Sequence, residues 1–315
     1  MDGFIIILHT QLSILNRVPT RRRLVGLPVV RFSDLGIESR LVGCLADQGI
    51  TEPFEVQIEA IPSAMEGRDI CCRAPTGSGK TLAFGLPLIS RTSPAKPKKP
   101  TALILTPTRE LAEQIRNVLD PLAWDSQMKV LSVYGGTSYG KQLRGLEKGV
   151  EILVACPGRL LDLLKRKALS LEDVGIVVLD EADRMADMGF MEPVCKIIDQ
   201  CISEPQMILF SATLDHEVSK LVKSYQNDPV RIEVGPKEIS MDSMEHLFWN
   251  IKPYKKTEIA VKSVRRAGKS IIFCRTRSGV DRLSDEMKLD DVPLSSLHGG
   301  PVSYTHLTLP TNREV

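Results

Sequence analysis

The residues with the clearest chemistry form one glycine-rich run, Ala74–Thr81. Its two glycines let the backbone curl so that successive N–H groups face phosphate oxygens. Lys80 supplies a point charge for β- and γ-phosphates, and the Thr81 hydroxyl can bind Mg²⁺. An apolar run before it (70–72) and a helix-like run after it (82–89) give the strand–loop–helix context of a phosphate-binding loop. The alternative is an ordinary glycine-rich turn. The predicted phosphate-contacting residues are Ala74, Pro75, Thr76, Gly77, Ser78, Gly79, Lys80 and Thr81.

A second set of candidate residues is acidic or carries a hydroxyl. Asp180 follows four apolar residues, as expected of a strand-end acid that holds Mg²⁺ through water. Glu181 beside it can orient or deprotonate an attacking water. A lone Asp–Glu pair is usually only part of a loop, but the phosphate loop favours the Mg²⁺ interpretation. Asp183 is predicted to accept hydrogen bonds from the hydroxyls of Ser211 and Thr213. The alternative role of these two hydroxyls is to cap the helix that follows, and both roles can hold at the same time.

A third set suits a polyanion. Arg109, the glycine pair Gly135 and Gly136, and Arg159 each follow an apolar run. Backbone N–H groups at glycines and at helix starts contact phosphates without reading base sequence. Few aromatic residues lie near them in the sequence, so recognition of the nucleic-acid backbone is favoured over base stacking.

The elements that must position these groups are strands and helices in alternation. The apolar runs 102–105, 129–133, 152–155, 176–179 and 207–210 each end in a polar or glycine-rich cluster. Near-continuous apolar runs indicate strands buried on both faces, hence an α/β fold with a parallel sheet covered by helices. Ligands bind outside the carboxyl ends of such strands. The clusters are therefore predicted to form one composite site.

Composition sets the wider limits. The chain has 315 residues, for which about two domains are expected. Its formal net charge is only +2, so nucleic-acid contacts must come from local groups. The seven cysteines show no zinc-ligand spacing and suggest small buried hydrophobes in a reducing, cytoplasmic compartment. No apolar segment approaches the length of a membrane span, so no membrane partner is expected.

Taken in order, these motifs resemble the DEAD-box ATP-dependent RNA helicases. The resemblance covers roughly Phe32 to Gly300 and implies two RecA-like P-loop domains that bind ATP, Mg²⁺ and RNA. Phe32 and Gln57 would read adenine, the former by stacking and the latter by its amide. Cys156 stands where the family usually has Thr, which puts one hydroxyl contact to RNA in doubt. The residues that the resemblance assigns to RNA are Thr108, Arg109, Gly136, Gly158 and Arg159, with Gly135 beside them.

The implied activity is an RNA-stimulated ATPase that separates short duplexes. Lys80, Asp180, Glu181, Asp183, Ser211 and Thr213 would form its catalytic set. A nucleotide-dependent RNA-binding module with little turnover is the alternative, because the arginines that the family carries in later motifs are not matched here. A DNA helicase of a related group is a weaker third possibility.

The C-terminal part fits the family less well. We expect a poorly ordered leader (1–30), a RecA-like domain (31–235), a linker (236–245), a partial second RecA-like domain (246–300) and a tail outside the family pattern (301–315). In the partial domain, strands are expected at 246–251, 270–274 and 292–297. So few strands would leave apolar residues such as Ile271, Ile272 and Phe273 partly exposed.

Overall fold

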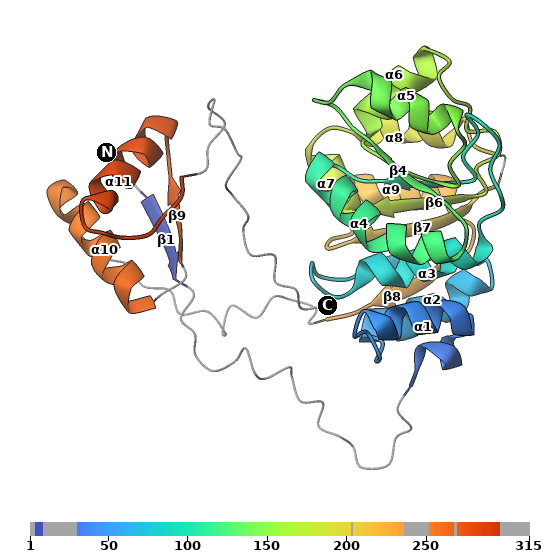
Figure 1. The fold of residues 1–315 in the computed structure, drawn as a ribbon, viewed down its shortest axis with the longest axis horizontal. Coiled ribbons are helices and arrows are strands. Elements are labelled where there is room, and N and C mark those ends of the chain that lie inside the picture. The colour runs from blue at the N-terminus through green and yellow to red at the C-terminus, as the bar shows by residue number, and fades with distance from the viewer. Residues whose placement is uncertain (1–3, 9–29, 203, 236–251, 268–269, 297–315) are drawn as a thin grey trace. The chain divides into compact units, whose positions relative to one another are not determined.

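The chain consists of two units, which are described one at a time. The computed structural model describes residues 4–8, 30–202, 204–235, 252–267 and 270–296 (Figure 1). One unit comprises Val29–Ile239, and the other combines Met1–Pro28 with Ser240–Val315. The predicted first domain, 31–235, falls within the larger unit, whereas the predicted linker, 236–245, lies outside the described residues.

The larger unit is built on a seven-stranded sheet with the strand order β4-β5-β3-β6-β7-β2-β8. All of its strand pairs are parallel, as the apolar runs predicted. In register, Arg73 at the end of β2 pairs with Ser211 at the end of β7, so the carboxyl ends align at one edge. The strands are β2 (Ile70–Arg73), β3 (Ala102–Leu105), β4 (Val130–Val133), β5 (Ile152–Ala155), β6 (Ile176–Asp180), β7 (Gln206–Ser211) and β8 (Val230–Glu233).

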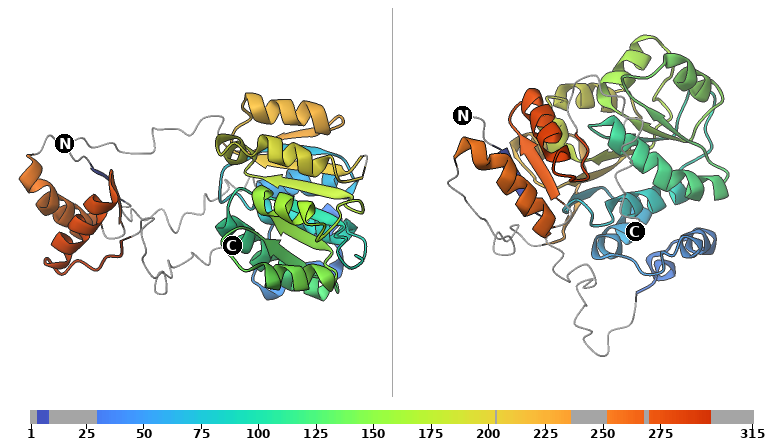
Figure 2. Two further views of the ribbon diagram at one scale, coloured as in Figure 1. Left: turned by 90° about the horizontal axis from the view of Figure 1, so that it is seen from above. Right: turned by 60° about the vertical axis from the view of Figure 1, so that its left-hand side comes forward.

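Helices cover both faces of this sheet, which lies between them in Figures 1 and 2. Successive strand residues point to opposite faces, so Cys72 and Ile104 join one apolar core while Cys71 and Leu103 join the other. The first core is covered by the short 3₁₀ helix η1 (Phe32–Leu35) and by α1 (Ser39–Asp47), α2 (Glu55–Met65), α3 (Lys80–Arg91) and α4 (Arg109–Asp125). The second is covered by α5 (Tyr139–Glu147), α6 (Pro157–Lys165), α7 (Ala182–Asp187), α8 (Met191–Ile198) and α9 (His216–Tyr225).

The smaller unit contains a two-stranded antiparallel sheet of β1 (Phe4–Leu8) and β9 (Ser270–Cys274). It also contains η3 (Pro253–Lys255), α10 (Lys256–Ala267) and α11 (Arg277–Lys288). Ile272 packs against the apolar core that these two helices share. Its neighbours Ile271 and Phe273 are 62% and 54% exposed, which confirms the expectation of exposed apolar residues on this strand.

Four expectations for the leader and the C-terminal part differ from the structure or fall outside the described residues. The leader was expected to be poorly ordered, but Phe4–Leu8 pairs with β9 along its whole length. The expected strand at 292–297 is wrong over residues 292–296, which form no strand. Val292 instead packs into the small core of α10 and α11. The expected strand at 246–251 and the tail at 301–315 lie outside the described residues.

Candidate functional site

The glycine-rich run forms the turn between β2 and α3. Gly77 and Gly79 have φ angles of 80° and 87°, in the left-handed region that favours glycine. A Cβ atom added to Gly79 would lie 2.5 Å from Cδ2 of Phe54 and 2.6 Å from Nε2 of Gln57. Glycine is therefore required at position 79 both by its backbone conformation and by these close contacts. The turn leads directly into the N-terminus of α3, where anions are stabilised by free N–H groups and the helix dipole.

Lys80 and Asp180 are both buried near this turn. Lys80 is only 8% exposed, and its Nζ donates a hydrogen bond to the Ala74 carbonyl oxygen at 3.3 Å. Asp180, the last residue of β6, is 3% exposed. Burial raises the pKa of Asp180 to about 6, and the positive charge of Lys80 opposes this rise. The structure thus places a buried acid and a buried cation together at the edge of the sheet.

The oxygen ligands here are too few to bind a cation through protein groups alone, but they suit Mg²⁺, which keeps part of its water shell. Within the part of the chain that the structure describes, no three His, Cys, Asp or Glu residues group as metal ligands. Mg²⁺ keeps several waters and is usually bound through one or two carboxylates plus substrate phosphates. Asp180 and the Thr81 hydroxyl, next to the phosphate-binding turn, fit that pattern.

Glu181 has an unusual backbone conformation. Its φ and ψ angles are 55° and 52°, which place a residue that is not glycine in the left-handed region. Its N–H donates a hydrogen bond to Oδ1 of Asp180 at 3.1 Å, and α7 begins at the next residue. Strain of this kind is frequent at functional sites, where the surrounding structure compensates for it.

Asp183 connects this acidic turn to the end of β7. Its Oδ2 accepts hydrogen bonds from the Thr213 hydroxyl at 3.2 Å and from the Thr213 N–H at 3.0 Å, as predicted for the hydroxyl. The prediction for Ser211 is wrong in direction, because the Ser211 hydroxyl accepts from the Asp183 N–H at 3.0 Å. The alternative role as a helix cap belongs to neither residue, since Asp215 caps α9 by accepting from the Val218 N–H.

Of the two candidate base-binding residues, only Gln57 is seen to contact the turn. Gln57, 2% exposed, accepts from the Phe54 N–H at 2.8 Å and donates to the Gly79 carbonyl oxygen at 2.9 Å. Its amide keeps one donor and one acceptor site beyond these bonds. Phe32 is 1% exposed and belongs to the first apolar core. Phe54, which the sequence analysis did not single out, is 45% exposed, and its ring lies against Gly79.

The candidate RNA-binding residues lie at the ends of β3, β4 and β5. Thr108 caps α4, its hydroxyl accepting from the Leu111 N–H at 3.3 Å. Arg109 opens α4 and pairs with Glu110. Gly136, with a φ angle of 80°, lies near Arg109, because an added Cβ would be 3.9 Å from the Arg109 Nη1.

The end of β5 supplies the remaining candidates. Pro157, Gly158 and Arg159 form the first turn of α6, and Arg159 donates to the Thr137 carbonyl oxygen at 3.3 Å. Gly135 and Gly136 lie in the turn after β4, just before Thr137. At Cys156, burial raises the thiol pKa to about 11, and the side chain makes no capping hydrogen bond to α6. Every candidate at the ends of these strands therefore lies at the carboxyl edge of the one sheet.

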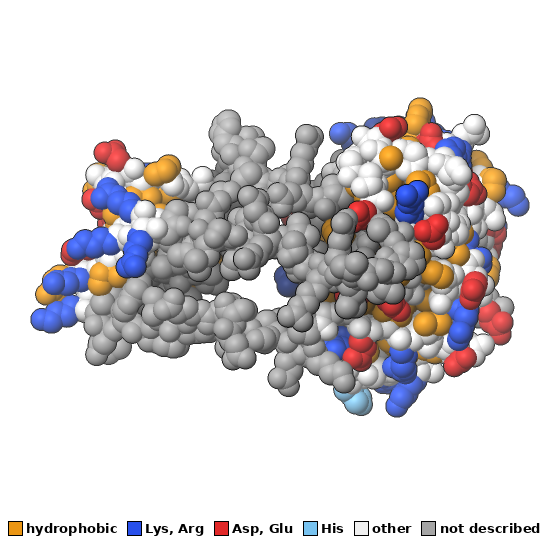
Figure 3. Space-filling model, turned by 90° about the horizontal axis from the view of Figure 1, so that it is seen from below, with side chains coloured by type: hydrophobic (Ala, Val, Ile, Leu, Met, Phe, Trp, Pro, Cys, Tyr) orange, Lys and Arg blue, Asp and Glu red, His pale blue; other side chains and the backbone are white. Residues whose placement is uncertain are grey.

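A hollow of about 830 Å³ lies outside this site, at the opposite edge of the sheet, where β2 and β7 begin. It is lined in part by Arg68, Gln206 and Tyr225. No helix in the described ranges is long and apolar enough to cross a membrane. On the face shown in Figure 3, basic and acidic side chains of the larger unit are interspersed, as expected from a net charge of +2.

Comparison with known proteins identifies relatives with this arrangement. A family model described as DEAD/DEAH box helicase matches residues 54–221, more than half of the chain. The DEAD-box ATP-dependent RNA helicase CshA of Bacillus subtilis is 33% identical over 272 residues, which are 86% of this chain and 55% of the relative. The RNA helicase CrhR of Synechocystis is 37% identical over 271 residues, 85% of this chain and 55% of the relative. The chain thus spans about half the length of these curated relatives.

Solved structures give the same result. A DEAD box protein from Methanococcus jannaschii has a TM-score of 0.62 and 29% identity, with 87% of this chain and 74% of the other covered. A hypothetical ATP-dependent RNA helicase from Sulfolobus tokodaii has a TM-score of 0.58 and 35% identity, with 63% and 57% covered. The RecA-like fold expected for the sheet is confirmed by these neighbours.

Proposed function

Because this chain belongs to the DEAD/DEAH box helicase family, we propose that it binds ATP with Mg²⁺ and RNA, and that it is part of an ATP-dependent RNA helicase. The observation that carries the proposal is the junction of the phosphate-binding turn with the buried pair Lys80 and Asp180. That junction lies on the same sheet edge as the candidate RNA-binding residues. Seven free thiols support a reducing compartment, and we include a cytoplasmic location in the proposal.

The roles of individual residues follow from their positions. The backbone of Ala74–Gly79 and the Lys80 ammonium hold the phosphates, while Gln57 and an aromatic neighbour hold the base. Thr81 and Asp180 hold Mg²⁺, which would offset charge on the phosphate oxygens. Glu181 orients the attacking water and accepts its proton.

A link between nucleotide and RNA is also part of the proposal. Asp183 joins the acidic turn after β6 to the end of β7 through Thr213 and Ser211. We propose that a change at the γ-phosphate reaches β7 by this route. Thr108, Arg109, Gly135, Gly136, Gly158 and Arg159 bind the RNA backbone in this proposal.

One observation favours the second candidate function, a nucleotide-dependent RNA-binding module with little turnover. In the smaller unit, β9 presents Ile271 and Phe273 to solvent. Among the residues that the structure describes, the smaller unit therefore has an uncovered apolar strand face, whereas both faces of the larger unit's sheet are covered.

RNA-stimulated phosphate release separates the two candidates. If the chain hydrolyses ATP as part of an RNA helicase, it releases phosphate faster when RNA is added. Glu181→Gln then lowers the rate of phosphate release about 10²- to 10⁴-fold while leaving ATP binding intact. A binding module retains both ligands but shows no stimulation. Failure to bind ATP would contradict both candidates.

A further inference from the structure

Gln142 is a buried amide that belongs to none of the motifs discussed so far. It lies on α5 and is 4% exposed. Its Nε2 donates to the Tyr134 carbonyl oxygen at 3.1 Å and to the Thr137 hydroxyl at 2.7 Å. Its Oε1 accepts from the Arg159 Nη1 at 3.0 Å. This one side chain therefore joins the residues on either side of the Gly135–Gly136 turn to Arg159 on α6.

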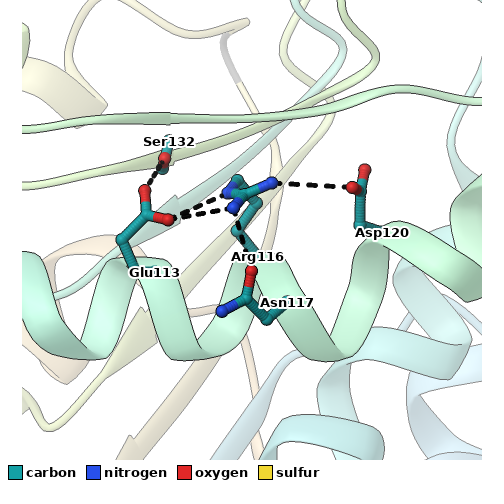
Figure 4. Close-up of polar contacts among 5 residues, drawn as sticks. All are labelled: Glu113, Arg116, Asn117, Asp120 and Ser132. Atoms are coloured by element: carbon teal, nitrogen blue, oxygen red, sulfur yellow. Dashed lines mark hydrogen bonds and ion pairs between the residues drawn. The ribbon is translucent and has the colours of Figure 1, made fainter. Parts of the chain in front are cut away.

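The strand that leads into this turn, β4, is held by α4. Glu113 on α4 accepts hydrogen bonds from Ser132 on β4 and from Arg116, and the bonds to Arg116 are 3.0 and 3.2 Å long (Figure 4). Burial raises the pKa of Glu113, but hydrogen bonds from Ser132, Arg116 and Tyr134 outweigh it and hold the pKa below the usual value. A charged carboxylate thus anchors the end of β4 immediately before the two glycines.

Arg159 is itself held on several sides. Besides Gln142, it donates through Nη1 and Nη2 to the Thr137 carbonyl oxygen at 3.3 and 3.2 Å. Its guanidinium carbon lies 4.1 Å from the centre of the Tyr139 ring, a cation–π distance. The Tyr139 hydroxyl in turn donates to Asp162. Arg159 therefore has little freedom, and among the described residues Gln142 supplies its only side-chain hydrogen-bond acceptor.

We propose that Gln142 is a positioning residue for RNA binding, which holds the Gly135–Gly136 turn and the Arg159 guanidinium in one fixed arrangement. This inference rests on the proposed function, because it assumes that these groups contact the RNA backbone. A binding surface fixed before the ligand arrives loses less conformational entropy on binding. Removing Gln142 frees Arg159 and also leaves the Tyr134 carbonyl and the Thr137 hydroxyl without this partner.

The test compares Gln142→Ala with Gln206→Ala in the full chain. Gln206 is a matched control, because it is a buried amide that donates to two carbonyl oxygens, those of Ala64 and Arg68, at the opposite edge of the sheet. Binding of a short fluorescein-labelled oligouridylate is measured by anisotropy over a series of salt concentrations. ATP affinity and thermal unfolding are measured on the same samples.

We expect Gln142→Ala to weaken oligouridylate binding about tenfold and to lower the salt slope by about 0.7, the value for one lost phosphate contact on a single strand. Its ATP affinity should not change. Gln206→Ala should reduce thermal stability to a similar degree but leave oligouridylate binding as it is. Equal loss of RNA affinity in both variants would show a general effect of destabilisation and would overturn the inference.

A double-mutant cycle with Arg159→Ala completes the test. If Gln142 acts through Arg159, the double variant binds oligouridylate only slightly more weakly than Arg159→Ala alone. Full additivity of the two losses would overturn the inference, since Gln142 would then act independently of Arg159. If the unsubstituted chain binds no RNA, the proposed function itself is overturned. If it binds RNA and Gln142→Ala binds RNA equally well, only this inference is overturned.

Discussion

The carboxyl group of Asp180 lies where a negative charge is poorly solvated. It is 3% exposed, and burial raises its pKa to about 6 despite the nearby ammonium of Lys80. The unfolded chain has an Asp pKa of about 3.9. The folded state therefore binds the proton more tightly, so Asp180 contributes most stability at low pH and loses it as pH rises through about 6. Keeping the Asp180 carboxylate ionised in the folded chain therefore costs free energy. In the proposed function, bound Mg²⁺ would offset this cost.

This gives a prediction about unfolding without Mg²⁺. We expect the free energy of unfolding of the unsubstituted chain, relative to Asp180→Asn, to fall by about 2 kcal/mol between pH 4.5 and 7.5. The change of this difference with pH reports the titration of Asp180. Asp180→Asn also removes a negative charge near Lys80, and this shifts the difference in unfolding free energy by the same amount at every pH. Urea unfolding at several pH values measures it. A difference that stays constant with pH would mean that the pKa of Asp180 is not raised.

Two phenylalanines compete for the role of stacking partner to the base. Phe32 was predicted for it, but its ring lies in the apolar core with 1% of its surface exposed. Phe54 is 45% exposed and lies against Gly79, close to the Gln57 amide. An aromatic ring needs a free face to stack on a base, and Phe54 has more exposed surface.

We therefore predict that Phe54→Ala weakens ADP binding about tenfold and leaves the affinity for inorganic tripolyphosphate unchanged. Stacking on a base is worth roughly 1–3 kcal/mol, and tripolyphosphate has no base to lose. Calorimetric titration of both ligands provides the measurement. Equal weakening of both would show that Phe54 supports the phosphate-binding turn instead of the base.

At the scale of elements, the buried strands were the most predictable part of the chain. Runs such as 102–105 and 152–155 are apolar throughout, which is the pattern of a strand covered on both faces. β1 could not be predicted in the same way, because Phe4–Leu8 is a short apolar run whose partner lies more than 260 residues away. Its pairing depends on tertiary contacts that local sequence does not contain.

The site was predictable in its positions but only in part in its hydrogen bonds. The carboxyl ends of parallel strands place Lys80, Asp180 and Thr213 together whatever their side-chain conformations. The direction of the Ser211 hydrogen bond, the exposure of Phe54 and the bridging amide of Gln142 depend on side-chain packing. A buried glutamine on an amphipathic helix gives no distinct signal in the sequence.

β9 provides a prediction about an element. Its alternate residues face opposite ways, since Ile272 packs on the core of α10 and α11 while Phe273 is 54% exposed. Phe273→Ser should therefore leave the unfolding of the smaller unit almost unchanged and reduce self-association. Ile272→Ser, the matched control, should destabilise that unit by about 2–4 kcal/mol. Sedimentation velocity and hydrogen exchange measure the two effects, and equal destabilisation by both substitutions would contradict the assigned facing of β9.

For the molecule as a whole, the central claim is that one sheet edge carries two distinct binding surfaces. In the proposed function, the turn after β2 and the end of β6 form the ATP surface, and the ends of β3, β4 and β5 form the RNA surface. β3 and β6 are neighbours, so the surfaces adjoin without sharing their main charged groups. A substitution in one surface should therefore leave binding to the other intact when each ligand is titrated alone.

A crossed titration tests this claim most directly. ATP with Mg²⁺ and a labelled oligouridylate are each titrated into the unsubstituted chain, Lys80→Ala and Arg159→Ala. We predict that Lys80→Ala loses ATP binding at micromolar nucleotide and keeps RNA binding. Arg159→Ala should keep ATP binding and lose RNA affinity in a manner that depends on salt but not on base sequence. Loss of both ligands in each folded variant, or of neither ligand in either variant, would contradict the account.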